Sequence, residues 1–276
     1  MSETIELISV GGGNMASAIV LGAVERGALR ADRVVVVDPN ERQRERFREV
    51  GVGACASLGE VDRGAAAGAS VMLAVKPQML RDVASGVGEV LGDGGVVWSI
   101  LAGVPSATVR ERCGGAARVV RLMPNTPARV GKGCTALAKG AGAVDGDDAL
   151  ARRVFGAIGQ VVEIAEAQMD AFTAVAGSGP AYFFAMVEAL AAAGERAGLG
   201  AEVAMAAARQ TAIGAAGLLE ASEEGAAALR EAVTSKGGTT AAGLGGLAEA
   251  GFAEAVERGV LAARDRGAEL GRASAE

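Results

Sequence analysis

The chain has 276 residues and a formal net charge of −6 at pH 7; 50% of its residues are hydrophobic and only 3% are aromatic. This length allows one large domain or two ordinary ones, with cores built from Ala, Val, Leu and Ile. Nucleic acids and anionic membranes are bound by clustered Lys and Arg, so the acidic balance argues against both partners. We therefore expect a small-molecule ligand.

The three cysteines, Cys55, Cys113 and Cys134, are odd in number and have no C-x-x-C spacing. The sequence therefore predicts no disulfide framework and no metal site, and indicates a reducing, cytoplasmic compartment. The N-terminal residues lack the basic region of a signal peptide, and the longest uncharged runs, 7–24 and 171–187, are interrupted by GGGN and GSGP. We expect neither a targeting segment nor a membrane span.

Short β-branched runs alternate with amphipathic stretches over the first part of the chain. We expect strands at 5–10, 33–38, 70–75, 96–101, 117–122, 134–138 and 160–164, with helices such as 41–50 and 79–90 between them. This alternation is typical of parallel strands joined by helical crossovers.

After Glu166 the β-branched runs disappear. Long segments rich in Ala, Leu, Glu and Arg predict helices at 180–198, 201–219, 241–251 and 252–270. The predicted fold class is α/β followed by all-α, with a Rossmann-type doubly wound sheet in residues 1–164 and a helical domain in residues 165–276. We expect a continuous helical junction near the boundary.

A glycine-rich loop follows the first predicted strand in the stretch ISVGGGNMASAIV. Gly11, Gly13 and Ala16 occupy the positions of a G-x-G-x-x-A dinucleotide fingerprint, in which the first glycine permits a tight turn and the second lets the main chain approach a pyrophosphate. The alternative is a strand-to-helix turn without a ligand. The place of the motif in the first βαβ unit favours the nucleotide site.

The second predicted strand ends at Asp38, where a carboxylate accepts hydrogen bonds from the adenosine ribose in NAD-preferring sites. Arg42 and Arg44 follow closely, so a loop movement that brings a guanidinium to a 2′-phosphate is an alternative, as is a simple turn before Pro39. The sequence leaves the choice between NADH and NADPH open.

The chain contains no histidine. This excludes the commonest general acid–base group and every metal site that uses histidine. Reduction of a carbonyl group usually needs a strong acid, whereas a C=N bond can be protonated before the hydride arrives and needs positioning more than acid catalysis. A nicotinamide enzyme without histidine therefore favours an imine substrate.

Several stretches together resemble the pyrroline-5-carboxylate reductase family. They are GGGNMASAI, AVKP at 74–77, LAGV at 101–104, RLMPNTPARVGKG at 121–133, GSGPAY at 177–182 and VTSKGGTTAAGL at 233–244. The resemblance covers about residues 5 to 270 in the order and at the spacing of the family. It implies reduction of 1-pyrroline-5-carboxylate to L-proline with NADPH or NADH, the last step of proline biosynthesis.

The resemblance also implies an assembly and a set of cofactor contacts. Members of the family are homodimers, often arranged further as rings of dimers, in which the nucleotide loops of one chain and a helical-domain loop of its partner form each active site. By position, the expected cofactor-binding residues are Gly11, Gly13, Asn14, Met15, Asp38, Val75, Lys76, Pro77, Ala102 and Asn125.

The stretch VTSKGGTTAAGL places two glycines immediately before a helix. At a helix start, free main-chain N–H groups together with the hydroxyls of nearby Ser and Thr form a site for a carboxylate, although a plain N-cap turn has the same sequence. By resemblance, Ser235, Gly237, Gly238, Thr239 and Thr240 bind the substrate carboxylate, with the Thr240 hydroxyl as the catalytic group beside the ring nitrogen.

Departures from the family pattern keep alternatives open. Lys236 stands where the family has proline, Ala176 replaces a serine and Leu101 replaces an alanine, which leaves room for a related cyclic imine acid as substrate. A β-hydroxyacid-dehydrogenase-like enzyme would need a lysine on the helix after the first domain, but no lysine lies between Lys139 and Lys236.

Overall fold

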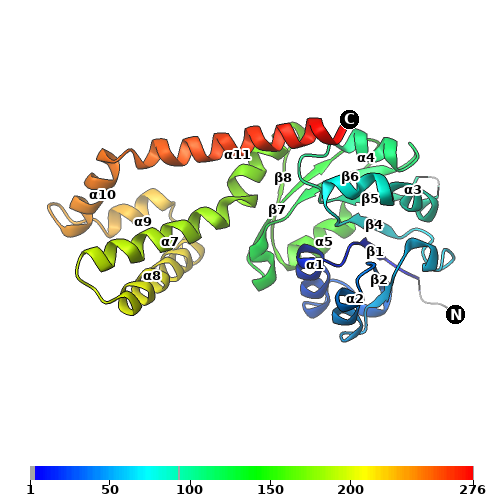
Figure 1. Ribbon diagram of the computed structural model, residues 1–276, viewed down its shortest axis with the longest axis horizontal. Helices are drawn as coiled ribbons and strands as arrows, with labels where there is room; N and C mark the ends of the chain where they lie inside the picture. Colours follow the sequence, from blue (N-terminus) through cyan, green and yellow to red (C-terminus); the bar gives the residue numbers. More distant parts are fainter. Residues whose placement is uncertain (1–3, 93, 276) are drawn as a thin grey trace. The chain divides into compact units, whose positions relative to one another are not determined.

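The computed structural model describes residues 4–92 and 94–275 (Figure 1). Within these ranges the strands are β1 (Leu7–Val10), β2 (Val34–Val37), β3 (Gly53–Cys55), β4 (Ser70–Leu73), β5 (Val96–Ser99), β6 (Arg118–Met123), β7 (Gly133–Lys139) and β8 (Gly159–Glu163). The helices are α1 (Asn14–Glu25), α2 (Glu41–Arg48), α3 (Leu80–Leu91), α4 (Ser106–Arg112), α5 (Ala149–Ala157), α6 (Met169–Phe172), α7 (Gly179–Arg196), α8 (Ala201–Ala221), α9 (Ala226–Ala232), α10 (Thr239–Glu249) and α11 (Phe252–Ala275).

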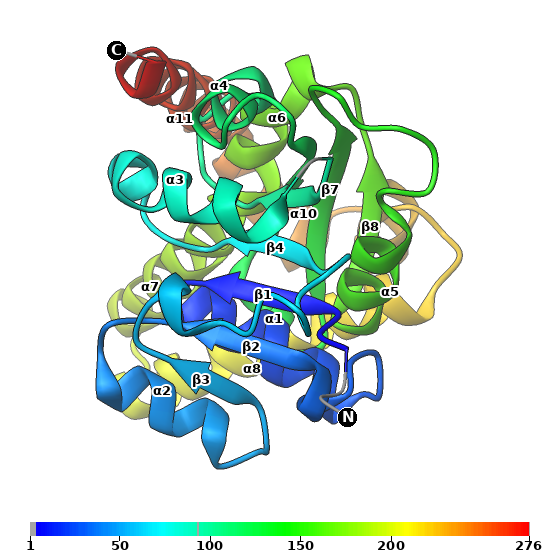
Figure 2. The same cartoon turned by 90° about the vertical axis from the view of Figure 1, so that its right-hand side faces the viewer.

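The described strands form one eight-stranded sheet in the order β3-β2-β1-β4-β5-β6-β7-β8. The pairs from β3 to β6 are parallel. From β1 the chain first adds β2 and β3 on one side and then β4, β5 and β6 on the other, so the direction of strand addition reverses between β1 and β4, as in a Rossmann-type sheet. Figure 2 shows β3, β2, β1 and β4 side by side. The predicted Rossmann-type fold followed by helices is confirmed.

Two features of the sheet differ from the prediction. Strand β7 is antiparallel to β6, because residues 124–132 form a short connection and a parallel partner needs a crossover of a dozen residues or more. Strand β8 returns parallel to β7 after α5. The short edge strand β3, with the sequence Gly-Ala-Cys, was not predicted because it has no β-branched run and forms by pairing with β2.

Helices cover both faces of the sheet, so successive strand residues are buried in different clusters. Ile8 packs with α3 residues such as Leu80, whereas its neighbour Leu7 packs with α1 residues such as Ile19. Trp98 is fully buried in the second cluster, and its ring centroid lies 6.2 Å from that of Phe155. This core holds the neighbouring parallel strands β1, β2 and β4 so that their carboxyl ends lie at the same edge of the sheet.

The chain forms two compact units, residues 1–178 with 263–276, and residues 179–262. The sheet ends at Glu163, close to the predicted boundary at residue 164, but the first unit extends beyond it into the following helix. A π-helical turn at Thr173–Gly177 connects α6 to α7 near the division at residue 178.

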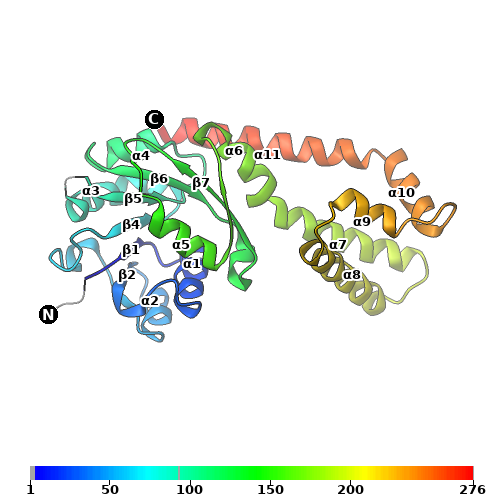
Figure 3. The ribbon, with the colours of Figure 1, turned by 180° about the vertical axis from the view of Figure 1, so that it is seen from behind.

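The helical unit buries little of its apolar surface. Helices α7 and α8 pack side by side through small residues such as Ala191, Ala204 and Ala208 (Figure 3). In contrast, Phe183 is 70% exposed and Phe184 is 65% exposed. The exposed apolar surface of this unit requires a partner.

One stretch of the described chain, Glu166–Arg196, has the length and composition of a membrane-crossing helix, which is weak evidence on its own.

Candidate active site

The three glycines after β1 differ in what a side chain would meet at each position. Gly11 has a φ of +104°, and a Cβ atom there would lie 2.5 Å from the carbonyl oxygen of Ala74. A Cβ atom at Gly12 would press on Val36 and Phe47, with the nearest ring carbon at 3.1 Å. A Cβ atom at Gly13 would meet nothing within 4 Å, so the first turn of α1 is open to a ligand.

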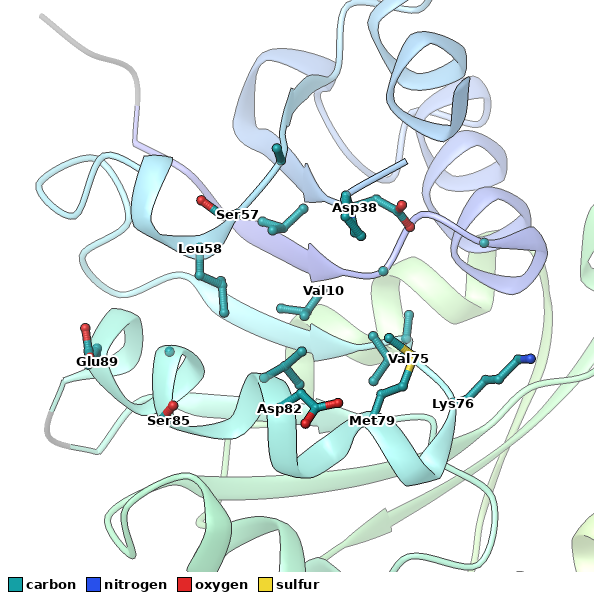
Figure 4. A pocket seen from close by; sticks show the side chains of 18 residues that line it. Val10, Asp38, Ser57, Leu58, Val75, Lys76, Met79, Asp82, Ser85 and Glu89 are labelled. Carbon is teal, nitrogen blue, oxygen red and sulfur yellow. The ribbon is translucent and has the colours of Figure 1, made fainter. Parts of the chain in front are cut away.

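An open cavity of about 560 Å³ lies beside this loop (Figure 4). Its walls include five of the predicted cofactor residues: Gly11, Gly13, Asp38, Val75 and Lys76. The ends of β1, β2 and β4 meet there, at the point where the strand order reverses, which is where α/β sheets bind their ligands. The residues therefore fit a dinucleotide.

Asp38 is fixed at the end of β2 by the main chain. One carboxylate oxygen accepts the N–H of Gly12 at 2.7 Å and the other accepts the N–H of Asn40 at 2.8 Å. The guanidinium of Arg44 donates to the carbonyl oxygen of Asp38 at 2.6 Å and also to Glu41. Asp38 thus links the glycine loop to the start of α2.

The cavity has walls that were not predicted from the sequence. They include Ala56, Ser57 and Leu58 after β3, and Met79, Asp82, Val83, Ser85, Gly86 and Glu89 on or near α3. The Ser57 hydroxyl donates to Glu60 at 3.0 Å. Residues 56–58 could have been predicted from the order of elements in a Rossmann-type fold. In that order a third strand follows α2 before the crossover to β4, and the loop after it reaches the ligand site.

The remaining predicted cofactor residues are not among the described walls of the cavity. Asn14 and Met15 begin α1, and Pro77 begins a 3₁₀ turn at the end of β4. Asn125 is buried, and both ends of its amide contact main-chain groups: Nδ2 donates to Ala176 at 2.9 Å and Oδ1 accepts from Cys134 at 2.8 Å. Its observed contacts connect β6, β7 and the π-helical turn.

Ala102 lies in a loop that is held from two sides. Gly103, with a φ of +75°, lies against α11, so that a Cβ atom there would be 3.0 Å from the carbonyl oxygen of Gly267. Three residues further on, both the N–H and the hydroxyl of Ser106 donate to Glu166, at 2.7 and 2.6 Å. The position of the loop is therefore set by contacts distant in sequence.

Glu166 is the centre of a partly buried network. Burial tends to raise the pKa of Glu166, but the hydrogen bonds from Ser106 and the nearby charge of Arg121 outweigh it and hold the pKa below its usual value. Arg121 is buried and donates to Glu166 at 3.2 Å. The carboxylate is therefore ionised and structural, and offers no proton for chemistry.

The three cysteines are free thiols. Burial raises the pKa of each thiol, that of Cys113 to about 11. Since the thiolate is the reactive form, they are poor nucleophiles.

The stretch 235–240 leads into α10 as predicted, but the helix begins at Thr239, two residues earlier than expected, so Thr239 and Thr240 are its first two residues. Gly237 has a φ of +73°, and a Cβ atom at Gly238 would lie 2.4 Å from the Ser235 hydroxyl. The N–H of Gly238 donates to the carbonyl oxygen of Ser235 at 3.0 Å, so it is not free for a ligand, contrary to the expectation of successive free N–H groups through this glycine. The open donors are those of the first helical turn, from Thr239 onward.

Comparisons with known proteins show the family of the chain. A family model described as pyrroline-5-carboxylate reductase dimerisation matches residues 166–270, and one described as NADP oxidoreductase, coenzyme F420-dependent, matches residues 4–103. The chain is 36% identical over 244 residues to the pyrroline-5-carboxylate reductase of Pisum sativum, which is 88% of each chain. It belongs to the pyrroline-5-carboxylate reductase family.

Solved structures of this family are similar over nearly the whole chain. A pyrroline-5-carboxylate reductase from Coxiella burnetii has a TM-score of 0.88 at 33% identity, covering 97% of this chain and 99% of that one. A pyrroline carboxylate reductase from Plasmodium falciparum with NADP bound has a TM-score of 0.82 at 27% identity, covering 98% and 100%. The resemblance inferred from the sequence motifs is confirmed.

Membership of the pyrroline-5-carboxylate reductase family explains the exposed apolar helices. The dimerisation model spans α7 to α10 and most of α11, where Phe183, Phe184 and Ile213 are exposed. A second copy of the chain covers such a surface in a homodimer, and most soluble oligomers are formed in this way. The stretch 235–240 lies inside the same matched region.

Proposed function

We propose that this protein is a pyrroline-5-carboxylate reductase that uses NADPH or NADH to reduce the C=N bond of 1-pyrroline-5-carboxylate to L-proline. One pairing of features carries the proposal. The chain combines a glycine loop that opens on a cavity of about 560 Å³ with a second glycine pair at the start of α10, in the sequence order of this family.

The nucleotide binds at the glycine loop. The N–H groups at the start of α1, including those of Asn14 and Met15, face the pyrophosphate, and the missing Cβ atom of Gly13 provides the space. Val75, Lys76 and Pro77 lie on the ribose side. Ala102 would lie toward the nicotinamide, together with Asn125 from the loop after β6.

The loop 235–240 binds the substrate carboxylate. The N–H groups of the first turn of α10 have no partner within the helix, and the hydroxyls of Ser235, Thr239 and Thr240 add donors. Gly237 and Gly238 allow this conformation, one by its positive φ and the other by the contact with Ser235. Binding by the carboxylate orients the ring.

Orientation supplies most of the rate in this scheme. When bound, NAD(P)H supplies the hydride to the imine carbon. The Thr240 hydroxyl lies beside the ring nitrogen and holds the proton there, directly or through water, so that the nitrogen becomes the secondary amine of proline. No histidine is needed, since an iminium already carries the proton.

We further propose that each active site combines the nucleotide loops of one protomer with the loop 235–240 of its partner, that dimers assemble into rings, and that the enzyme is cytoplasmic. The free state of all three cysteines supports a reducing compartment.

Turnover by the purified protein tests the proposal. With 1-pyrroline-5-carboxylate, we expect oxidation of NADH or NADPH and equimolar formation of proline. A folded dimer that turns over neither coenzyme would contradict it. Preference for another cyclic imine acid would instead support the alternative substrate suggested by Lys236, and activity on a hydroxyacid would support a β-hydroxyacid dehydrogenase.

A further inference from the structure

The charges around the adenosine end of the cavity bear on the choice between NADH and NADPH. The two coenzymes differ by a phosphate on the 2′-hydroxyl of the adenosine ribose. An enzyme that prefers NADPH needs donors or cations at that position, and one that prefers NADH needs an acceptor. The end of β2 and the loop after β3 form this part of the cavity.

Asp38 presents a fixed acceptor there. Each of its carboxylate oxygens accepts one main-chain N–H, from Gly12 and from Asn40. An ionised carboxylate has about four lone-pair sites, so acceptor capacity remains for ribose hydroxyls. Because both donors belong to the main chain, rotation of the side chain away from the ribose would cost two hydrogen bonds.

Of the two arginines that closely follow Asp38, Arg44 is already engaged, and Arg42 is exposed and is not among the described walls of the cavity. Arg44 donates to the carbonyl oxygen of Asp38 and to the carboxylate of Glu41, and its side chain is only 11% exposed. Among the described residues that line the cavity, Lys76 is the one with a positive charge, and in Figure 4 its side chain extends to the right of the view and not toward Asp38. No lining cation therefore faces the 2′ position within the described part of the chain.

Two hydrogen-bond donors of the loop after β3 already face the carboxylate of Glu60. The hydroxyl of Ser57 donates to one oxygen of Glu60 at 3.0 Å, and the N–H of Ala56 approaches the other at 3.4 Å. These groups would otherwise be available to a phosphate. Glu60 thus removes two donors and adds a negative charge behind them, and Asp82 and Glu89 add two more carboxylates to the walls.

We propose that this enzyme prefers NADH, with Asp38 as the specificity-determining residue and Glu60 acting through Ala56 and Ser57. A 2′-phosphate at this position meets a fixed carboxylate with no cation of the described lining residues beside it, whereas a 2′-hydroxyl donates to Asp38. The inference rests on the dinucleotide site of the proposed function and not on the imine substrate.

Binding of coenzyme fragments to the full-length dimer tests this directly. We would titrate ADP-ribose and 2′-phospho-ADP-ribose by calorimetry, since neither carries a nicotinamide and no turnover is involved. We expect ADP-ribose to bind at least about tenfold more tightly. Equal binding, or tighter binding of the phosphorylated fragment, would overturn the proposal.

Three variants assign the discrimination to its residues. The quantity compared is the affinity for ADP-ribose divided by the affinity for 2′-phospho-ADP-ribose. Asp38→Ser should lower this ratio by about tenfold or more, and Asp38→Asn, which keeps the side-chain volume, should lower it as well. Glu60→Gln should give a smaller shift of the same sign. The matched control is Glu45→Gln, which removes a charge from the exposed face of α2 outside the cavity. An equal shift in the control would remove Asp38 from this role.

The two proposals fail separately. A preference for ADP-ribose in a protein that does not reduce 1-pyrroline-5-carboxylate would remove the proposed activity and keep this inference. An active reductase that binds the phosphorylated fragment more tightly would do the opposite.

Discussion

The carbonyl oxygen of Gly103 would lie 2.4 Å from a Cβ atom placed on Gly271, so the loop 101–104 and the C-terminal turns of α11 touch through their main chains. Such an approach is possible only where both elements lack side chains. The last helix of the chain therefore fixes the loop that carries Ala102, the residue assigned to the nicotinamide side.

Gly271→Ala should therefore weaken both stability and coenzyme binding. The intrinsic preference for alanine in helices would stabilise α11 by about 1 kcal/mol, so a net loss of about 1–3 kcal/mol reports the contact with Gly103. Chemical denaturation and the KM for coenzyme measure the two effects. Gly156→Ala in α5, where a Cβ atom meets nothing within 4 Å, is the control and should be neutral or stabilising. Equal behaviour of both variants would show that the contact is unimportant.

Gly11 and Gly13 should respond differently to alanine although they lie two residues apart. Gly11→Ala places a Cβ atom 2.5 Å from Ala74 in a backbone conformation with positive φ, and should lower Tm by several degrees. Gly13→Ala meets no protein atom within 4 Å and should leave Tm unchanged, while coenzyme affinity falls by about tenfold or more because the methyl group occupies the pyrophosphate space. Thermal unfolding and fluorescence titration separate the two results. A Gly13→Ala protein with normal coenzyme affinity would contradict the assigned site.

The glycine loop and the strands around it were predictable because their signals are local. The run Val34–Val37 is β-branched and mostly buried, and the pattern around Gly11 and Gly13 combines a buried strand with a helix start. The same holds for Gly237 and Gly238, whose place before a helix was predicted although the hydrogen bond that occupies the N–H of Gly238 was not.

The features that the sequence did not reveal depend on contacts between distant residues. Strand β3 has three residues and exists because β2 offers an edge. The antiparallel direction of β7 follows from the length of its connection to β6. Glu60 beside Ser57, and Gly103 against α11, have no periodicity that could indicate them, since each acquires its role only when the chain folds.

Glu166→Gln should destabilise the protein in a pH-dependent manner. At neutral pH the loss should be about 1–3 kcal/mol, because Ser106 loses a charged acceptor and the buried Arg121 loses its ion pair. The pKa of Glu166 is lower in the folded protein than its usual value of 4.5, so the stabilisation is fully present above that value and disappears as the pH falls through the folded-state pKa. The difference in Tm between wild type and variant should therefore shrink below about pH 4.

Glu89→Gln provides the comparison for this experiment. Glu89 pairs with Arg63, but both side chains are more than half exposed, at 63% and 62%. Exposed pairs contribute about 0–1 kcal/mol, so little change is expected at any pH. A constant Tm difference for Glu166→Gln from neutral to acidic pH would contradict the stabilising role of its charge.

Thr240→Ala should lower turnover by about 10²-fold with coenzyme affinity nearly unchanged, because the hydroxyl is assigned to the ring nitrogen of the substrate. Steady-state kinetics and coenzyme titration measure the two quantities. The control is Thr234→Ala: Thr234 follows α9, and its hydroxyl donates to the carbonyl oxygen of Arg230 in that helix at 2.6 Å. A parallel loss of coenzyme affinity in Thr240→Ala would mean that the residue supports the structure of the site rather than the reaction.

Mixed dimers decide whether each active site uses two chains. A protomer with Gly13→Ala and a protomer with Thr240→Ala are each defective alone. If every site joins the nucleotide loop of one chain to the loop 235–240 of its partner, the mixed dimer has one site with both changes and one with neither, and about half of the activity returns. If each site lies within one chain, both sites stay defective.

The reciprocal dimer gives the opposite result and completes the test. Here one protomer carries both changes and its partner is wild type. Sites shared between chains then have one defect each and the dimer is nearly inactive, whereas sites within single chains leave about half of the activity. Two affinity tags purify each mixed dimer from co-expressed chains. Recovery in the second dimer and not in the first would contradict the shared site.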